Sequence, residues 1–311
     1  MDNVLFVPST PDTEWLQEIL PGTSPAALPV AGRRAIDYMM EAARRRDILF
    51  IEILDWHYSP AVASSFSEPT TTGFPVFYMK GEGAMPRGLA EIENLSTPLT
   101  QSLQDGLVVA WGVFAVDAPV ALESEPIPEA ECVSTPPGIY RREGGRWARV
   151  SAEIMPVCDI ATWHAANMRV LHSPGKLTLP GYSAEKGVHI GRNVVLERGV
   201  DASAPVLLCD DAWCARNAIL GGDVIVGERS YVGEGTKLSR TVVGDDTQVG
   251  DGLVFEDKII VGSRVIDAQT GVWTDVEDPG VARPVGGAAR RSGPLRRAMN
   301  FLFGWARGRM A

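Results

Sequence analysis

The sequence predicts an α/β domain, a parallel β-helix behind it and a short basic amphipathic helix at the C-terminus. Three observations indicate this architecture. A strand, helix and strand pattern opens the chain, a period of six residues runs from Val188 to about Val265, and the segment from Pro279 to Ala311 carries seven arginines and no carboxylate. We expect the three units to span residues 1–178, 179–270 and 271–311.

The N-terminal unit begins with an apolar run at residues 3–7 that ends at a proline-rich loop. Residues 35–46 then place Ile36, Met39, Met40 and Ala43 at helical spacing, with arginines at the C-terminal end, where cations suit the helix dipole. Residues 47–54 are again apolar. Strand, helix and strand in this order is typical of an α/β domain.

The six-residue period consists of two rows of small or apolar side chains, which fits a β-helix of hexapeptide repeats rather than an α-helix. The first row is Val188, Val194, Val200, Val206, Ala212, Ala218, Val224, Ser230, Thr236 and Val242. The second row is Ile190, Leu196, Ala202, Leu208, Cys214, Leu220, Val226, Val232 and Leu238, and after the loss of one residue it continues as Val243, Val249, Phe255 and Val261. We expect the second-row side chains to point into the core, and glycine often follows them, as a sharp corner requires. With three sixes in a coil, the segment predicts about four coils.

Composition restricts the classes of function. The chain has 311 residues, 45% of them hydrophobic, and a net charge of −10, so nucleic acid is not an expected partner. Its N-terminus lacks the basic region of a signal peptide and no apolar run is long enough to cross a bilayer, which favours a cytoplasmic location. The four cysteines form no C-x-x-C pair, and we expect buried, reduced thiols.

Two segments resemble motifs of the sugar-1-phosphate nucleotidyltransferases. Residues 28–33 (LPVAGR) followed by Ile36-Asp37-Tyr38 are similar to the family segment that comes after the nucleotide-binding loop and starts the first long helix. Residues 159–162 (DIAT) followed by Ala166-Asn167 resemble the D-x-G-T…A-N segment that closes the family's catalytic domain. Residues 138–147 are similar to a family hairpin, turning at Gly144-Gly145. In that family a left-handed β-helix often follows, so the resemblance implies a shortened nucleotidyltransferase-like domain and a left-handed coil.

The sequence departs from the family at the residues that carry its chemistry. The family's G-x-G-T-R loop binds the triphosphate, but residues 7–14 here (VPSTPDTE) have no glycine and no arginine. The family's Pro-Lys is replaced by residues 24–27 (SPAA), and the first lysine of the chain is Lys80. At the first metal-binding carboxylate stands Val113, with Asp117 as a substitute. The second is present as Asp159, which is either a metal ligand or a helix N-cap.

The resemblance therefore implies a protein of nucleotide-sugar or surface-polysaccharide metabolism that is a pseudoenzyme. It would bind a nucleotide sugar, or a catalytic partner protein, without turning a nucleotide over. One alternative is an active transferase, with Ser9, Thr10, Arg33 and Arg34 on phosphate and Asp159 and Asp117 on Mg²⁺. Another is a structural scaffold. In each case we expect a homo-oligomer formed through the β-helix.

Other candidate chemistry is limited. His189 is the only histidine of the repeat and would be the acyltransferase base of some hexapeptide proteins, although its place suits a structural turn. Residues 295–310 predict an amphipathic helix that either contacts a membrane or partner or caps the β-helix. A membrane contact would make the protein peripheral on the inner membrane face. The tail residues expected to make such a contact are Arg296, Arg297, Leu302, Phe303 and Trp305.

Overall fold

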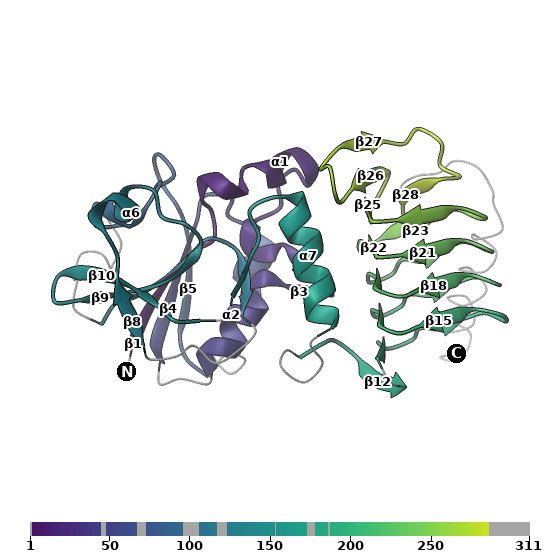
Figure 1. Ribbon diagram of the computed structural model, residues 1–311, viewed down its shortest axis with the longest axis horizontal. Coiled ribbons are helices and arrows are strands. Elements are labelled where there is room, and N and C mark those ends of the chain that lie inside the picture. Colours follow the sequence, from purple (N-terminus) through teal and green to yellow (C-terminus); the bar gives the residue numbers. More distant parts are fainter. Residues whose placement is uncertain are drawn as a thin grey trace, which may run out of the picture.

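The computed structural model describes residues 2–44, 48–66, 73–95, 106–116, 123–152, 154–172, 178–185 and 187–285. An α/β unit and a β-helix stand side by side, with helix α7 (Ile160–Leu171) between them (Figure 1). The α/β domain and the following parallel β-strands confirm the coarse fold prediction. Asp117 and the tail residues Arg296, Arg297, Leu302, Phe303 and Trp305 lie outside the described residues.

The N-terminal unit is built on a seven-stranded sheet in the order β5-β4-β1-β6-β9-β10-β8. Its first four strands are parallel and the remaining three are antiparallel. The strands are β1 (Asp2–Val7), β4 (Ile48–Asp55), β5 (Val76–Lys80), β6 (Val108–Trp111), β8 (Ser124–Pro126), β9 (Gly138–Glu143) and β10 (Arg146–Val150). The hairpin of β9 and β10 turns at Gly144-Gly145, both at positive φ, as the sequence predicted.

Helix α2 (Ala35–Arg44) covers one face of this sheet because its apolar side points inward. Met39 and Met40 lie in one buried cluster with Phe6, Ile51 and Ile53 of the central strands. The short elements are η1 (Pro11–Thr13), α1 (Trp15–Ile19), η2 (Pro25–Ala27), β2 (Pro29–Val30), β3 (Arg33–Arg34), α3 (Pro60–Ser64), α4 (Leu89–Ile92), β7 (Phe114–Val116), α6 (Glu129–Val133) and β11 (Ile154–Pro156).

The β-helix contains four successive sets of three short strands, as the period of six predicted. It is preceded by β12 (Tyr182–Glu185), which pairs antiparallel with β13. In the first three sets, each strand pairs in parallel with the strand one coil further on. The strands are β13 (Val188–Ile190), β14 (Val195–Leu196), β15 (Asp201–Ser203), β16 (Val206–Leu208), β17 (Trp213–Cys214), β18 (Ile219–Gly221), β19 (Val224–Val226), β20 (Tyr231–Val232), β21 (Lys237–Ser239), β22 (Thr241–Val243), β23 (Thr247–Val249) and β24 (Val254–Glu256).

The lost residue of the repeat shortens a corner. Gly222 and Asp223 separate β18 from β19, whereas Arg240 alone, at φ 42°, separates β21 from β22. The next coil is equally short, since Val242 pairs with Ile259 and Val243 with Ile260. The expected inward position of Val261 is therefore wrong, because Ile260 occupies the interior instead.

As far as the shortened corner at Arg240, both sequence rows line the interior of the β-helix, where Val206, Leu208 and Cys214 are fully buried. The corner glycines are explained by the coil beyond. A Cβ at Gly227 would lie 2.5 Å from Oδ1 of Asp245, and this oxygen accepts a hydrogen bond of 2.7 Å from the Glu228 amide. Gly191 and Gly233 meet Asp210 and Asp251 in the same way. Glycine is needed there because an aspartate of the next coil fills the space.

The C-terminal end of the β-helix is covered by its own last strands. After β25 (Lys258–Val261), strands β26 (Arg264–Asp267) and β27 (Trp273–Asp275) form an antiparallel meander. Strand β28 (Ala282–Pro284) then pairs with β23 and places Ala282 in the interior. These strands form the end cap that the sequence analysis had assigned, as one alternative, to the tail.

The two units share a core. The middle residues of β16, β19 and β22, which point away from the β-helix interior, are Leu207, Ile225 and Val242, and they form one buried cluster with Trp163 and Val170 of α7. Polar contacts add to this seam. Arg264 donates to the carbonyls of Glu18 and Ile19 at 2.7 Å, and His172 lies 2.5 Å from Asp223. In the described part of the chain, every helix is too short or too polar to cross a membrane.

Candidate functional site

In the parallel part of the sheet the strand order reverses at β1, because β1 pairs with β4 on one side and with β6 on the other. Ligands of open α/β sheets bind in the crevice outside the carboxyl ends of the strands at such a switch point. Ser9 and Thr10 follow β1 at this place, and Asp55 ends β4 beside them. A ligand site is therefore expected at the carboxyl edge of this sheet.

The carboxylate of Asp55 is the centre of a hydrogen-bond cluster at this edge. Its Oδ1 accepts from the hydroxyl of Ser9 and, at 2.9 Å, from the backbone amide of His57. Its Oδ2 accepts from the hydroxyl of Ser24 and, at 2.8 Å, from that of Tyr78. Asp55, Ser9 and Ser24 are each fully buried. One carboxylate thus joins the ends of β1 and β4 to the middle of β5 and to the start of η2.

The cluster has the composition of a nucleophilic site but not its geometry. His57 Nδ1 lies 3.4 Å from the Ser9 hydroxyl. The Asp55 carboxylate accepts directly from this serine, and from His57 it accepts the backbone amide rather than a ring nitrogen. In a Ser-His-Asp relay the carboxylate orients the imidazole, which in turn takes the serine proton. Burial raises the pKa of Tyr78 above its ordinary range, so this phenol stays a donor to Asp55. The arrangement is that of a satisfied structural network.

The remaining part of the predicted phosphate loop is folded on itself. Thr10 is fully buried, and its backbone is tied to Thr13 by hydrogen bonds of 3.0 and 2.7 Å that cap η1. The loop therefore presents a closed turn where nucleotide-binding loops present a row of free amides.

Arg33 and Arg34, the other predicted phosphate ligands, already have acidic partners. Arg33 pairs with Glu41 at 2.7 Å, donates to the carbonyl of Thr178 at 2.8 Å and lies over the ring of Tyr38. Arg34 forms two contacts with Asp37, at 2.7 and 3.1 Å. A ligand phosphate at β3 would have to displace these carboxylates.

Asp159 is the N-cap of α7. Its Oδ1 accepts from the amide and the hydroxyl of Thr162, both at 2.7 Å, in a capping box. Val113, at the family's first carboxylate position, is buried in the shared core. Within the described residues, no three side chains among His, Cys, Asp and Glu cluster as a metal site would require.

The two motifs that carry the family resemblance meet at the seam between the units. Asn167 Oδ1 accepts from the amide of Ala31 at 2.7 Å, and its amide group donates to the carbonyl of Trp163 at 2.8 Å. The indole of Trp163 donates to the carbonyl of Pro29 at 2.7 Å. Residues of both segments thus fasten α7 to the β2–β3 turn, a role that the sequence analysis did not assign.

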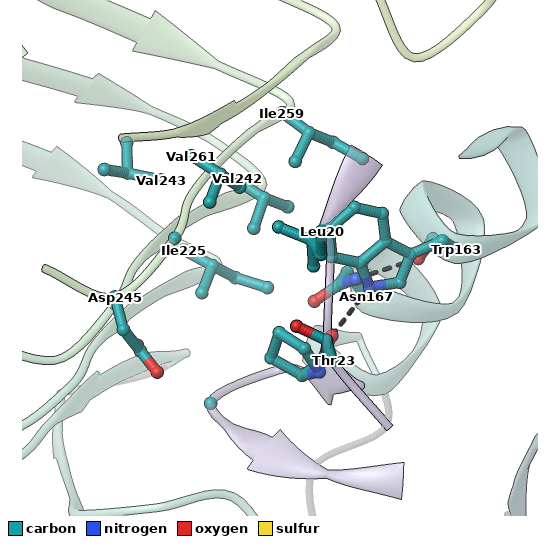
Figure 2. Close-up of a pocket in the computed structure, with 14 residues that line it drawn as sticks. Leu20, Thr23, Trp163, Asn167, Ile225, Val242, Val243, Asp245, Ile259 and Val261 are labelled. Atoms are coloured by element: carbon teal, nitrogen blue, oxygen red, sulfur yellow. Dashed lines mark hydrogen bonds between the residues drawn. The ribbon is translucent and has the colours of Figure 1, made fainter. Parts of the chain in front are cut away.

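A cavity of about 180 Å³ lies at this seam. Figure 2 shows Trp163 and Asn167 on one side of it and Ile225, Val242 and Ile259 of the β-helix on the other. Its lining is mainly apolar, and the polar groups of Trp163 and Asn167 are already bonded to the backbone. We therefore interpret it as a packing space of the interface.

A second hollow, of about 440 Å³, lies beside Gly32, Tyr182, Arg192 and Asp210. Arg192 is bonded to Asp210 through Nε at 2.8 Å and Nη2 at 2.5 Å, so the strongest charges of this groove neutralise each other.

Comparison with known proteins adds no family. No protein-family model matches the chain, and neither does any curated protein. The functional inference therefore rests on the geometry described above. Sequence reasoning did not find Asp55, Ser24 and Tyr78 as a cluster. The one available signal was an acid at the end of an apolar strand, since that position meets the neighbouring strand ends at the same edge of a parallel sheet.

Proposed function

We propose that this chain is a catalytically degenerate relative of the sugar-1-phosphate nucleotidyltransferases that acts by binding a partner rather than by turning over a nucleotide. Its place would be nucleotide-sugar or surface-polysaccharide metabolism. The relationship is supported by the LPVAG and DIAT…AN segments, which contact each other through Asn167, and by the β-helix that follows them.

The observation that carries the loss of catalysis is the Asp55 cluster. Phosphoryl transfer depends on preorganised positive charge and amide donors aimed at the phosphates. Here the switch point holds a carboxylate, three hydroxyls and a closed turn, and Ser9 and Thr10 have no exposed surface. A polyanion would meet negative charge at this place instead of a cradle of donors.

An active transferase would need a different arrangement of the same residues. Arg33 and Arg34 would have to leave Glu41 and Asp37, and Asp159 would have to leave its cap to hold Mg²⁺ together with Asp117. Each change breaks contacts that stabilise the fold, which is why we favour the binding function.

Isothermal titration calorimetry of the full chain with ATP, GTP, CTP, UTP, dTTP and their common sugar diphosphates, with and without Mg²⁺, tests the proposal. We expect no binding below millimolar concentration. Micromolar binding that is lost in Arg33→Ala or Arg34→Ala, but kept in the exposed control Arg146→Ala, would contradict the proposal and place a working nucleotide site at β3.

A further inference from the structure

The two ends of the β-helix are finished differently. At the C-terminal end, strands β26 to β28 cover the last coil (Figure 1). At the N-terminal end, described residues cover only one of the three sides, where β12 pairs with β13. Strands β14 and β15 stand first in their sheets, each with a single neighbour, so both present an open edge.

The apolar interior of the β-helix reaches the surface at this open end. Leu196 occupies an inward position of the first coil and is 42% exposed, whereas Cys214, its counterpart one coil further on, is 0% exposed. Ile190, Val194 and Val200 are likewise only partly buried, although the interior residues of the second coil are fully enclosed. A terminal coil with an apolar end needs a cover.

The rim charges of this end indicate what the cover is. Arg192 and Glu197 are already paired, with Asp210 and Arg216 of the next coil. Arg198 and Asp201, of opposite sign and three residues apart, have no ion-pair partner within the described ranges. A surface with one unpaired charge of each sign is self-complementary, because a two-fold axis brings each arginine to the other copy's aspartate.

We infer that two copies of this chain associate end to end through their first coils, around a two-fold axis. Leu196 and its neighbours form the apolar centre of the contact, and Arg198 of each copy pairs with Asp201 of the other. Strand β12 extends its sheet by one strand beyond the first coil, whereas the other two sheets begin at β14 and β15. The projecting β12 of one copy therefore fits over the open edges of the second copy. The basic tail is a poorer occupant, because residues 295–310 carry arginines and no carboxylate and so leave Arg198 of the rim without a partner.

The size of the contact sets the expected affinity. The first coil has 18 residues, since Val188 pairs with Val206. A standard interface contributes about 20–30 residues from each side, so this one is at the small end. We therefore expect a dimer that forms in the micromolar range and dissociates on dilution. This inference does not depend on the proposed function, because it uses only the end of the β-helix.

Sedimentation velocity of the full chain from about 1 to 200 μM tests the inference. Leu196→Glu places a charge in the apolar centre and should raise the dimer dissociation constant at least tenfold. Val254→Glu is the matched control. Val254 is also an exposed apolar residue of the β-helix, 71% exposed, but it lies in the last coil. It should leave the dimer intact.

Charge reversal tests the two-fold pairing itself. Arg198→Asp and Asp201→Arg should each weaken the dimer, and the double variant should recover most of the affinity, because both inter-copy pairs are then restored in reverse. Circular dichroism of each variant checks that it is folded, so that a loss of dimer is not a loss of structure.

Three results would overturn the inference. One is a monomer throughout the concentration range. Another is a dimer that responds equally to Leu196→Glu and Val254→Glu, or not at all to either. The third is a monomeric full chain whose shortened form, residues 1–285, dimerises, since the tail would then be the cover.

Discussion

At the carboxyl end of the N-terminal sheet, Asp55 is fully buried and accepts four hydrogen bonds, whereas at the first coil of the β-helix Leu196 belongs to the interior and is 42% exposed. The first region is where α/β folds bind ligands, and here the hydroxyls of Ser9, Ser24 and Tyr78 are bonded to the Asp55 carboxylate. The second is where a repeat fold must be capped, and within the described residues it is left open. From this contrast we expect recognition to use the β-helix rather than the crevice.

The largest expected effect comes from breaking the closed region. Asp55→Ala would leave the hydroxyls of Ser9, Ser24 and Tyr78 without their common acceptor in a buried site. An unsatisfied buried polar group costs about 1–3 kcal/mol, and some of these hydroxyls can rotate toward another acceptor. We therefore expect the free energy of unfolding to fall by about 4 kcal/mol. Urea denaturation measures it, with the exposed Glu82→Ala as control. A loss below about 1 kcal/mol would mean that the cluster does not hold the strand ends together.

The next effect tests whether the two regions belong to one cooperative unit. Ile225→Ala removes a side chain from the core shared by α7 and the β-helix and should cost about 3 kcal/mol. Far-UV circular dichroism and tryptophan fluorescence should still report a single transition, because both units lose the same support. Val254→Ala, at an exposed site of similar chemistry, should cost less than about 0.5 kcal/mol. Two separated transitions in the unmodified chain would contradict the shared core.

Substitutions of Asp159 distinguish the role of a helix N-cap from that of a metal ligand. Asp159→Ala removes the acceptor of the Thr162 amide and should lower the free energy of unfolding by about 1 kcal/mol, as N-cap substitutions do. Asp159→Asn should retain most of that stability, because asparagine also caps helices well. Thermal unfolding with and without Mg²⁺ measures both variants. A Mg²⁺-dependent stabilisation of the unmodified chain that both variants lose would identify Asp159 as a ligand instead.

The smallest effect concerns the exposed ion pair between Arg229 and Asp246, which joins two neighbouring coils of the β-helix, and it depends on pH. The side-chain hydrogen bond from Arg229 lowers the pKa of Asp246, against the effect of burial. A lowered folded pKa stabilises the fold above the unfolded value of about 3.9 and loses this contribution as pH falls through the folded pKa. Arg229→Ala should therefore cost less than about 1 kcal/mol at pH 7, and this cost should shrink as pH falls through the lowered folded pKa of Asp246. Arg146→Ala, at an exposed site with no ion pair among the described residues, should show no such pH dependence. A cost of Arg229→Ala that does not shrink at acid pH would exclude Asp246 as its source.

The sequence predicted the β-helix in most of its detail because each coil repeats the same local requirements. Two inward side chains and a corner glycine recur every six residues, and even the shortened corner at Arg240 is visible as a shift of the rows. The sequence analysis did not predict the second short coil, because Ile259, Ile260 and Val261 are all aliphatic and the spacing does not show which one points inward.

The candidate site was less accessible to sequence reasoning because it depends on contacts between distant segments. Asp55 meets Ser24 and Ser9 only when three strand ends share an edge, and no local pattern gives that distance. Arg33 and Arg34 have the charge that phosphate needs. The pairing of Arg34 with Asp37, three residues on, was visible as a local spacing, whereas the pairing of Arg33 with Glu41 depends on how α2 begins. For Asp159 the local sequence did allow the cap, since Thr162 stands at the position of a capping box.

The most direct test of the central claim is a turnover assay on the full chain. Each nucleoside triphosphate is supplied with hexose 1-phosphates and Mg²⁺, and pyrophosphate release is followed. A crevice closed around Asp55 predicts release no faster than in the protein-free reaction. Release that exceeds this background and is lost in Asp159→Asn would contradict the account, because it would show a working transferase whose catalytic groups leave the contacts described here.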